Sequence, residues 1–257
     1  YDINDALTLT WVTSYTDRDV LVVRDATALT GSITGGSFGP PASIYTIDAP
    51  LYDATQAKGF TQELRLSGER GAVQWVASVF YTDSERDYQQ NLQVFGFEDG
   101  CRVVSCGPLS GLPTAGTKLA NKDELYKSDL HYDYTQKAIF GEATWKVTDR
   151  FDLTGGLRFY DFEESRTQVF DGLFSDPNDS VGTVSADGFA PRVIASFKLN
   201  ENTRLNGQIS KGFRLGGIND PLNRPLCTPA DLATFDGRQN WEDETLWNYE
   251  VGSKSTI

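Results

Sequence analysis

Apolar and polar residues alternate with a period of two along much of the chain, which is typical of β-strands with one face against an apolar environment. The pattern is clearest over residues 137–147, where one face carries Ile139, Gly141, Ala143, Trp145 and Val147. After a tight connection at residues 148–150, the alternation resumes over residues 151–160. These two segments are therefore predicted to form a hairpin.

The same alternation recurs along the chain and predicts about eight antiparallel strands, many of them longer than about ten residues. Strands of that length are unusual in globular sheets but ordinary for tilted strands that cross a membrane. The predicted strands include residues 7–15, 63–66, 73–82, 137–147, 151–160, 189–199, 204–214 and 246–251.

The connections between the predicted strands alternate in length. Residues 68–71, 148–150 and 200–202 form tight turns, whereas the stretches near residues 25–58, 90–129, 171–187 and 216–244 are long and rich in Gly, Pro, Asp and Asn. Bacterial outer-membrane barrels have short periplasmic turns and long extracellular loops. The strands that start near Leu7, Val73, Phe151 and Arg204 are accordingly predicted to run outward.

Aromatic residues near predicted strand ends also favour a membrane barrel, because aromatic belts lie at membrane interfaces. They include Trp75, Trp145, Tyr160 and Phe213. We therefore predict an all-β fold, an antiparallel transmembrane outer-membrane β-barrel of which this chain forms a part.

Composition and charge narrow the possible classes. The chain has 257 residues, of which 39% are hydrophobic, enough to order a folded protein. Its formal net charge of -13 excludes nucleic acid as an expected partner, which requires a basic surface. No run of about 18 apolar residues predicts a membrane-spanning helix. Because Met is absent even at position 1, we expect a fragment of a longer protein.

Cys101 and Cys106 lie close together between two predicted strands, and a loop disulfide in an oxidising compartment fits them. Cys227 is left without an assigned partner. A four-ligand zinc site is disfavoured because His131 is the single histidine in the sequence.

Catalytic and cofactor motifs are not found in the sequence. His131 lies between Asp129 and Asp133 without a nucleophile motif or metal-ligand spacing. The DPNDS stretch at residues 176–180 contains oxygen ligands but lacks the spacing of a calcium loop. We predict that the protein is not an enzyme and holds no cofactor.

Four stretches together resemble the TonB-dependent outer-membrane receptors, and they occur in the order that this family has. They are FTQELRLSG at residues 60–68, IFGEATWKVTDRFDLTGGLRFYDFEESR at 139–166, APRVIASFKLNENTRLNGQISKGFRLGGIND at 190–220 and ETLWNYEVGSKS at 244–255.

The resemblance implies a barrel of about 22 strands that is closed by a separate N-terminal plug domain. Residues 1–257 would form about a third of the barrel wall, without the plug and without the C-terminal strand. The implied location is the outer membrane of a Gram-negative bacterium, in contact with its lipid. The implied mechanism is uptake of a scarce nutrient, driven by the TonB energy-coupling complex through the plug. A ferric siderophore is the first expectation, followed by an oligosaccharide or cobalamin.

In such a barrel the charged strand positions are expected to line a water-filled lumen. An Arg on the lipid face costs about 2–4 kcal/mol near the midplane. We expect these residues mainly to form ion-pair ladders and plug contacts, and we expect ligand recognition in the loops around residues 101–106 and 216–241. The candidate lumen residues are Glu63, Arg65, Glu142, Arg158, Arg192, Arg204 and Arg214.

Two alternatives remain open from the sequence. A passive porin-like channel has the same strand pattern but no plug. A soluble carbohydrate-binding β-sandwich also shows alternation, but it requires that the faces carrying Ile139, Trp145, Leu157 and Phe197 form a buried core.

Overall fold

The structure is a computed structural model that describes residues 1–34, 39–222, 224 and 227–256. Residues 35–38, 223, 225 and 226 belong to two of the predicted long connections and lie outside the described residues. Among the described residues no helix is long and apolar enough to cross a membrane.

The described residues form one nine-stranded antiparallel sheet in which the strand order is β1-β2-β3-β4-β5-β6-β7-β8-β11. The predicted all-β antiparallel fold is thus confirmed, and the sheet is open. The strands are β1 (Asp2–Asn4), β2 (Leu7–Asp25), β3 (Pro50–Arg70), β4 (Val73–Gln93), β5 (Glu124–Thr148), β6 (Phe151–Asp171), β7 (Asn178–Lys198), β8 (Thr203–Arg214) and β11 (Glu244–Ser255).

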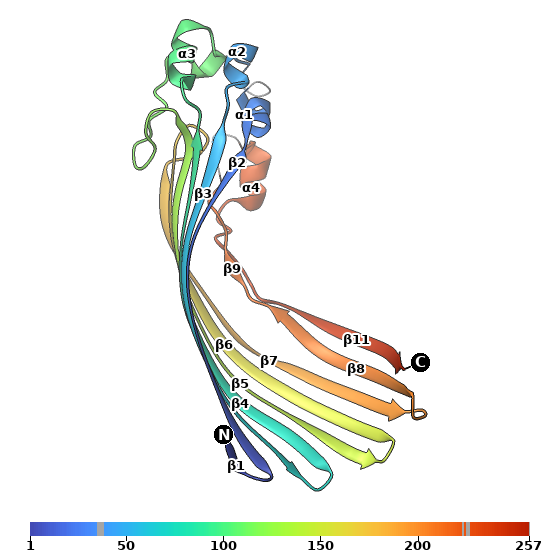
Figure 1. The fold of residues 1–257 in the computed structure, drawn as a ribbon. Helices are drawn as coiled ribbons and strands as arrows, with labels where there is room; N and C mark the ends of the chain where they lie inside the picture. The colour runs from blue at the N-terminus through green and yellow to red at the C-terminus, as the bar shows by residue number, and fades with distance from the viewer. Residues whose placement is uncertain (35–38, 223, 225–226, 257) are drawn as a thin grey trace.

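Tight turns lie at one end of this sheet, and the long connections with their short helices lie at the other (Figure 1). This arrangement agrees with the predicted alternation of short and long connections. The remaining elements are α1 (Thr27–Ile33), α2 (Ala42–Tyr45), α3 (Phe97–Val103), α4 (Pro229–Phe235) and a small ladder of β9 (Gly217–Ile218) with β10 (Asn240–Trp241).

One face of the sheet is apolar and exposed over its middle. A row of side chains in register crosses β3 to β7 on this face and consists of Leu64, Val79, Ile139, Phe159 and Phe189. Ile139 is 63% exposed and Phe189 is 55% exposed. A continuous apolar surface of this kind requires an apolar solvent, as the lipid-facing band of a barrel has.

The sandwich alternative requires the opposite burial. Ile139, Trp145, Leu157 and Phe197 are exposed by 63%, 51%, 50% and 42%, and no second sheet covers them among the described residues. The β-sandwich interpretation is therefore wrong.

The strands extend further than the alternation predicted. Strand β7 begins at Asn178, although residues 171–187 were predicted to be a connection, and β3 begins at Pro50, within the predicted connection 25–58. In these added parts of β3 and β7 apolar and polar residues no longer alternate regularly, so strand pairing continues without the period-two signal.

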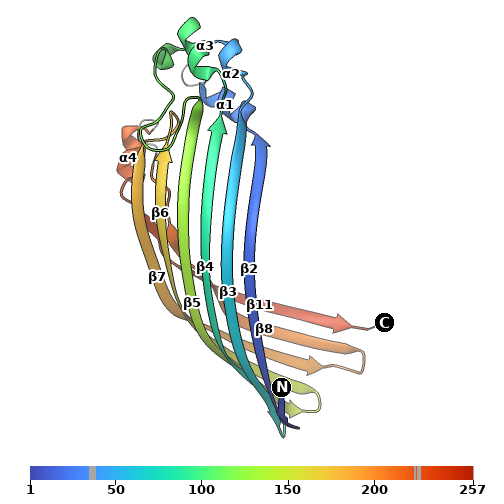
Figure 2. The same ribbon diagram turned by 60° about the vertical axis from the view of Figure 1, so that its left-hand side comes forward.

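The β7–β8 ladder covers only Arg192–Lys198 and Arg204–Ser210. It ends next to Pro191, which has no N–H to donate to a neighbouring strand. Beyond this point β8 leaves β7 together with β11, and the segment with β9 and α4 lies on the concave side of the sheet (Figures 1 and 2). The connection between β8 and β11 is therefore folded inward.

Buried apolar packing is concentrated at the loop end. The two connections that hold α1, α2 and α3 share a core, which we call the cap core. Its members are Ala26, Ile44, Ala49, Leu92, Val94, Phe97, Cys101, Cys106, Leu109 and Leu125. These loops are therefore a packed unit.

Candidate functional site

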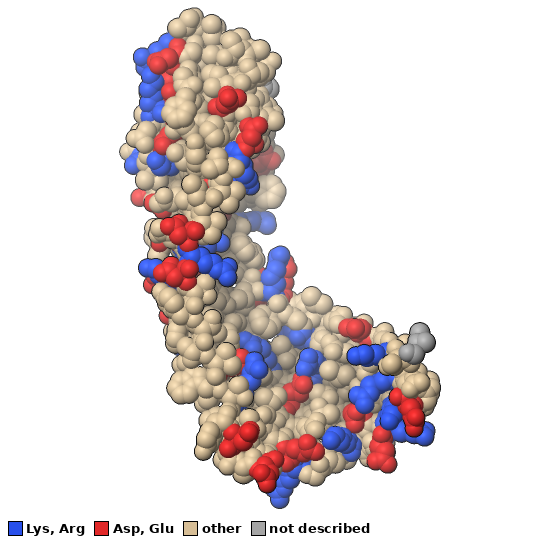
Figure 3. All heavy atoms as spheres, viewed as in Figure 1, with Lys and Arg blue, Asp and Glu red and all other residues tan. Residues whose placement is uncertain are grey.

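The predicted lumen residues of β3 to β7 lie on the face opposite Ile139. Arg65, Ser78, Phe140 and Arg158 form one row in register across β3 to β6. In the view of Figure 3, basic and acidic side chains are interleaved over the lower half of the molecule. Acidic and basic side chains therefore lie next to one another along the wall.

Glu63 and Arg65 form the first of these pairs. Arg65 Nε and Nη2 donate to the Glu63 carboxylate at 2.5 and 2.8 Å, and Ser78 Oγ also donates to it at 2.9 Å. The Arg158 guanidinium lies over the rings of Phe80 and Phe140, with its carbon 5.3 and 5.6 Å from their centres. Arg158 therefore makes cation–π contacts with aromatic rings, whereas Arg65 forms an ion pair with a carboxylate.

Glu142 and Arg192 form an ion pair across β6. The residue of β6 between them is Gly156, and a Cβ there would lie 3.0 Å from Glu142 Oε2. The missing side chain leaves room for the pair to meet.

Arg204 and Arg214 complete the predicted set. Arg204 lies 3.6 Å from Asp152, and Arg214 lies 3.1 Å from Glu244. Sequence reasoning did not identify these acidic partners. Strand register places Glu244 directly opposite Arg214, whereas Asp152 lies two strands away from Arg204. Solvated pairs of this kind typically contribute less than about 1 kcal/mol each.

Cysteine labelling distinguishes the two faces. We expect Glu142→Cys to react with a membrane-impermeant maleimide in intact outer membranes and Ala143→Cys to be protected, because neighbouring residues point to opposite faces. Both variants are made in a Cys227→Ser background, since Cys227 is a free thiol in this structure. Equal labelling at both positions would contradict the assignment of the faces.

A second cluster lies between the apolar band and the long connections, and the sequence analysis did not predict it. Arg86, Tyr132 and Arg166 are in register across β4, β5 and β6. The guanidinium carbons of Arg86 and Arg166 lie 4.1 and 4.7 Å from the centre of the Tyr132 ring, and Arg86 lies 5.7 Å from the centre of Tyr88. We call these four residues the arginine–tyrosine platform.

The inward segment docks on the platform through Arg166. Arg166 Nη1 donates to the Ile218 carbonyl at 2.8 Å, and Arg166 also pairs with Asp220. Next to it, Gln168 Nε2 donates to the Asn219 carbonyl at 3.3 Å. These contacts hold the start of the β8–β11 connection against the inner wall.

A cavity of about 480 Å³ lies between this segment and strands β6 and β7. Its lining includes Gln168, Ser180, Phe235 and Arg238. Below it, Tyr160 stacks on Phe213 with ring centres 3.7 Å apart, and its O–H donates to Asp243 at 3.3 Å. The predicted recognition region 216–241 therefore contributes to the lumen side of the wall.

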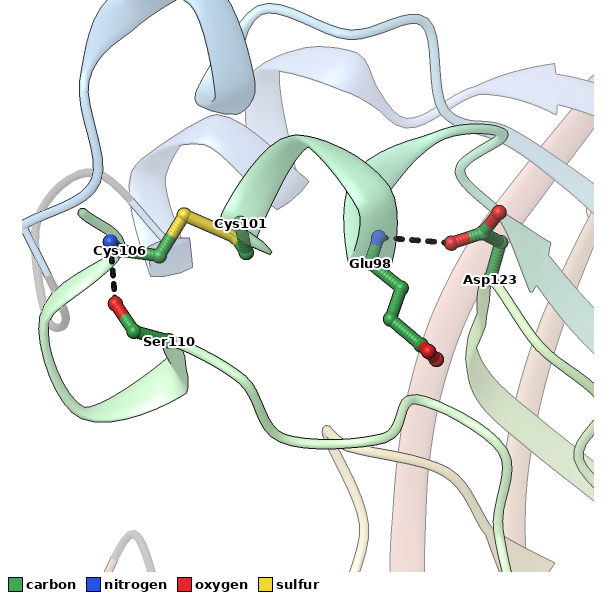
Figure 4. The surroundings of a disulfide bond; sticks show 5 residues. All are labelled: Glu98, Cys101, Cys106, Ser110 and Asp123. Atoms are coloured by element: carbon green, nitrogen blue, oxygen red, sulfur yellow. Dashed lines mark hydrogen bonds between the residues drawn. A yellow bond between two sulfur atoms is a disulfide. The ribbon is translucent and has the colours of Figure 1, made fainter. Parts of the chain in front are cut away.

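A disulfide joins Cys101 to Cys106 at the C-terminal end of α3 (Figure 4). Next to it, the Cys106 N–H donates to Ser110 Oγ at 2.7 Å. At the start of α3, Asp123 accepts hydrogen bonds from the N–H groups of Gly96 and Glu98, each at 2.9 Å. The helix is therefore fixed at both ends.

The Glu98 carboxylate is buried in the same loop. It accepts from the Thr114 N–H at 2.8 Å and from the Thr114 hydroxyl at 2.9 Å. These donors, with the Arg102 charge, lower the pKa of Glu98 although burial opposes them. Glu98 therefore ties α3 to the return segment of the loop as an ionised carboxylate.

Asp171 clamps the same loop from the end of β6. Its carboxylate accepts hydrogen bonds from the N–H groups of Thr117, Lys118, Leu119 and Ala120 at 2.6–3.2 Å. Burial alone raises the pKa of Asp171, but the backbone donors outweigh it and lower the pKa to about 2. No sequence pattern indicates this clamp, because its partners are backbone groups.

The other candidates from the sequence are separate from these clusters. His131 contacts Asp87 at 2.6 Å and Asp133 at 3.3 Å on the outer face. In the DPNDS stretch, Asp179 pairs with Lys118. Within the described ranges, no group of three or more His, Cys, Asp or Glu side chains is placed to hold a metal ion.

Comparison with known proteins gives a family match over nearly the whole chain. The family model described as TonB dependent receptor-like, beta-barrel matches residues 1–256. The pesticin receptor of Yersinia enterocolitica is 30% identical over 117 residues, which are 46% of this chain and 16% of that protein. The pesticin receptor of Yersinia pestis is 29% identical over the same length.

Solved structures share the fold. The ferric yersiniabactin uptake receptor FyuA from Yersinia pestis superposes with a TM-score of 0.67 and 16% identity, over 99% of this chain and 32% of that one. The siderophore receptor PiuA from Acinetobacter baumannii gives a TM-score of 0.60 and 16% identity, over 100% and 36%. The chain thus spans about a third of these structures and 16% of the pesticin receptors.

Proposed function

The chain belongs to the TonB-dependent receptor family as part of its β-barrel domain, and from this we propose that it forms a wall segment of a ferric-siderophore uptake receptor. Barrels of this family lie in the outer membrane of Gram-negative bacteria, which is where this chain resides. The family consists of transport receptors.

The observation that carries the proposal is the charged and aromatic inner face under a packed outer cap. A rigid wall lined by paired charges leaves a water-filled path, and the platform adds cations and rings near its outer entrance. FyuA is named a ferric yersiniabactin uptake receptor and PiuA a siderophore receptor, which supports the ligand class.

We further propose that the wall acts as the fixed frame of the transport cycle. The ligand docks on the outer loops and on a plug domain, and the TonB complex moves the plug. The ion pairs of the inner face would then hold the frame and contact the plug, while the lipid-facing band remains unchanged.

Iron uptake by the full-length receptor tests this function. The receptor is expressed in a host that lacks its own siderophore receptors, and radioactive iron is supplied as a siderophore chelate, with and without functional TonB. We expect uptake that requires TonB. Equal uptake without TonB would indicate a passive porin-like channel, and no uptake of any chelate would contradict the ligand class.

A further inference from the structure

We propose that the arginine–tyrosine platform selects iron chelates that are anionic and aromatic, with phenolate or catecholate oxygens, over neutral chelates. This inference rests on the proposed uptake function and adds the chemical class of the ligand to it. The juxtaposition that carries it is the Arg86–Tyr132–Arg166 row across three neighbouring strands.

The platform lies where an incoming ligand would reach it. On β4 the last apolar residue of the lipid-facing side is near Tyr81. Arg86 follows five positions later, on the inner face. The platform is therefore above the lipid band and below the cap that contains α3. Arg86 is exposed and Tyr132 is half-buried.

Arg86, like Arg158, lies over aromatic rings, and this distinguishes it from the inner-wall arginines that form ion pairs. Arg65, Arg192 and Arg166 each have a carboxylate partner. In the part of the chain that the structure describes, Arg86 lies over two tyrosine rings and forms no ion pair. Its N–H donors therefore remain available to anionic oxygens.

Stacking adds selectivity for a planar, aromatic ligand. A guanidinium is planar and weakly hydrated, and it pairs with carboxylate-like oxygens while it stacks on a ring. A catecholate or phenolate chelate presents both charged oxygens and ring faces. A ferric trihydroxamate has no net charge and no aromatic ring, so the platform gives it no comparable interaction.

Glu164 provides an internal control for the charge. It lies half-buried on the same face of β6, two positions before Arg166, and has no ion pair among the described side chains. The negative charge of Glu164 repels an anionic ligand. Removing this charge should therefore strengthen binding, whereas removing the positive charge of Arg86 should weaken it.

The test measures Kd for the purified full-length receptor by tryptophan fluorescence quenching. The probes are a synthetic ferric tris-catecholate and a neutral ferric trihydroxamate. We expect the wild type to favour the catecholate at least about tenfold, and Arg86→Gln to weaken catecholate binding about tenfold without changing hydroxamate binding. Glu164→Gln should tighten catecholate binding.

Each outcome decides between the two proposals. Equal affinity of the wild type for both probes, or the same loss for both in Arg86→Gln, overturns the selectivity of the platform while iron uptake by the receptor stands. If neither probe binds and no chelate supports uptake, the proposed function fails together with the inference. Thermal unfolding of each variant must match the wild type, and Tyr132→Leu serves as the second variant if Arg86→Gln does not fold.

Discussion

Ile139→Arg is expected to lower the free energy of unfolding of the receptor by about 2–4 kcal/mol when the protein is folded in a bilayer. Ile139 is 63% exposed, and its neighbours in register are Val79 and Phe159. In water, an exposed position would tolerate the change within about 0.5 kcal/mol. The large loss arises because the outer face is solvated by hydrocarbon, where a guanidinium loses its hydration.

The measurement is denaturant unfolding of the receptor in lipid vesicles. Gln136→Arg is the matched control on the same strand, because Gln136 is on the inner face and is expected to change stability by no more than about 0.5 kcal/mol. If the two variants were equally stable, the outer face would not contact lipid.

Asp171→Asn is expected to release the loop that follows α3. The carboxylate accepts four backbone N–H bonds, and an amide can accept with only one oxygen while its NH₂ group faces the same donors. Loss of charge-assisted bonds at a buried site costs about 2 kcal/mol, so hydrogen exchange at residues 117–120 should become about thirtyfold faster.

The control for this variant is Asp179→Asn. Asp179 of β7 pairs with Lys118 of the same loop, but the Asp179 side chain is 72% exposed. Loss of this ion pair should therefore hardly change hydrogen exchange in the loop. Unchanged exchange at residues 118–120 in Asp171→Asn would show that the carboxylate does not hold the loop.

The clamp also has a defined pH dependence. The pKa of Asp171 falls from 3.8 to about 2 on folding, so its stabilisation is fully present above the unfolded pKa and is lost as pH falls toward the folded pKa. Intrinsic-rate-corrected exchange at residues 118–120 should therefore be constant from neutral pH down to about pH 4 and should accelerate below it.

The membrane explains which parts of this fold the sequence predicts. Lipid on one side and water on the other impose the alternation around Ile139, so register and facing follow for Glu142 and Arg192. Above the band both sides are aqueous, and residues 178–187 and Arg86 carry no such pattern although the ladder continues. The inward position of Asp220 depends on Arg166, far away in the chain, so local sequence could not predict it.

The Asp171 clamp binds backbone groups, and every residue except proline supplies an N–H. Gly116 is the constrained neighbour, because a Cβ there would lie 2.1 Å from the Asp171 carboxylate oxygens. The strand ends Gln93 and Glu124 that carry the loop are ladder partners. The exposed side chains of Thr117 and Lys118 can therefore be replaced without loss of the anchor, whereas Ala120 is buried and its side chain is constrained by packing.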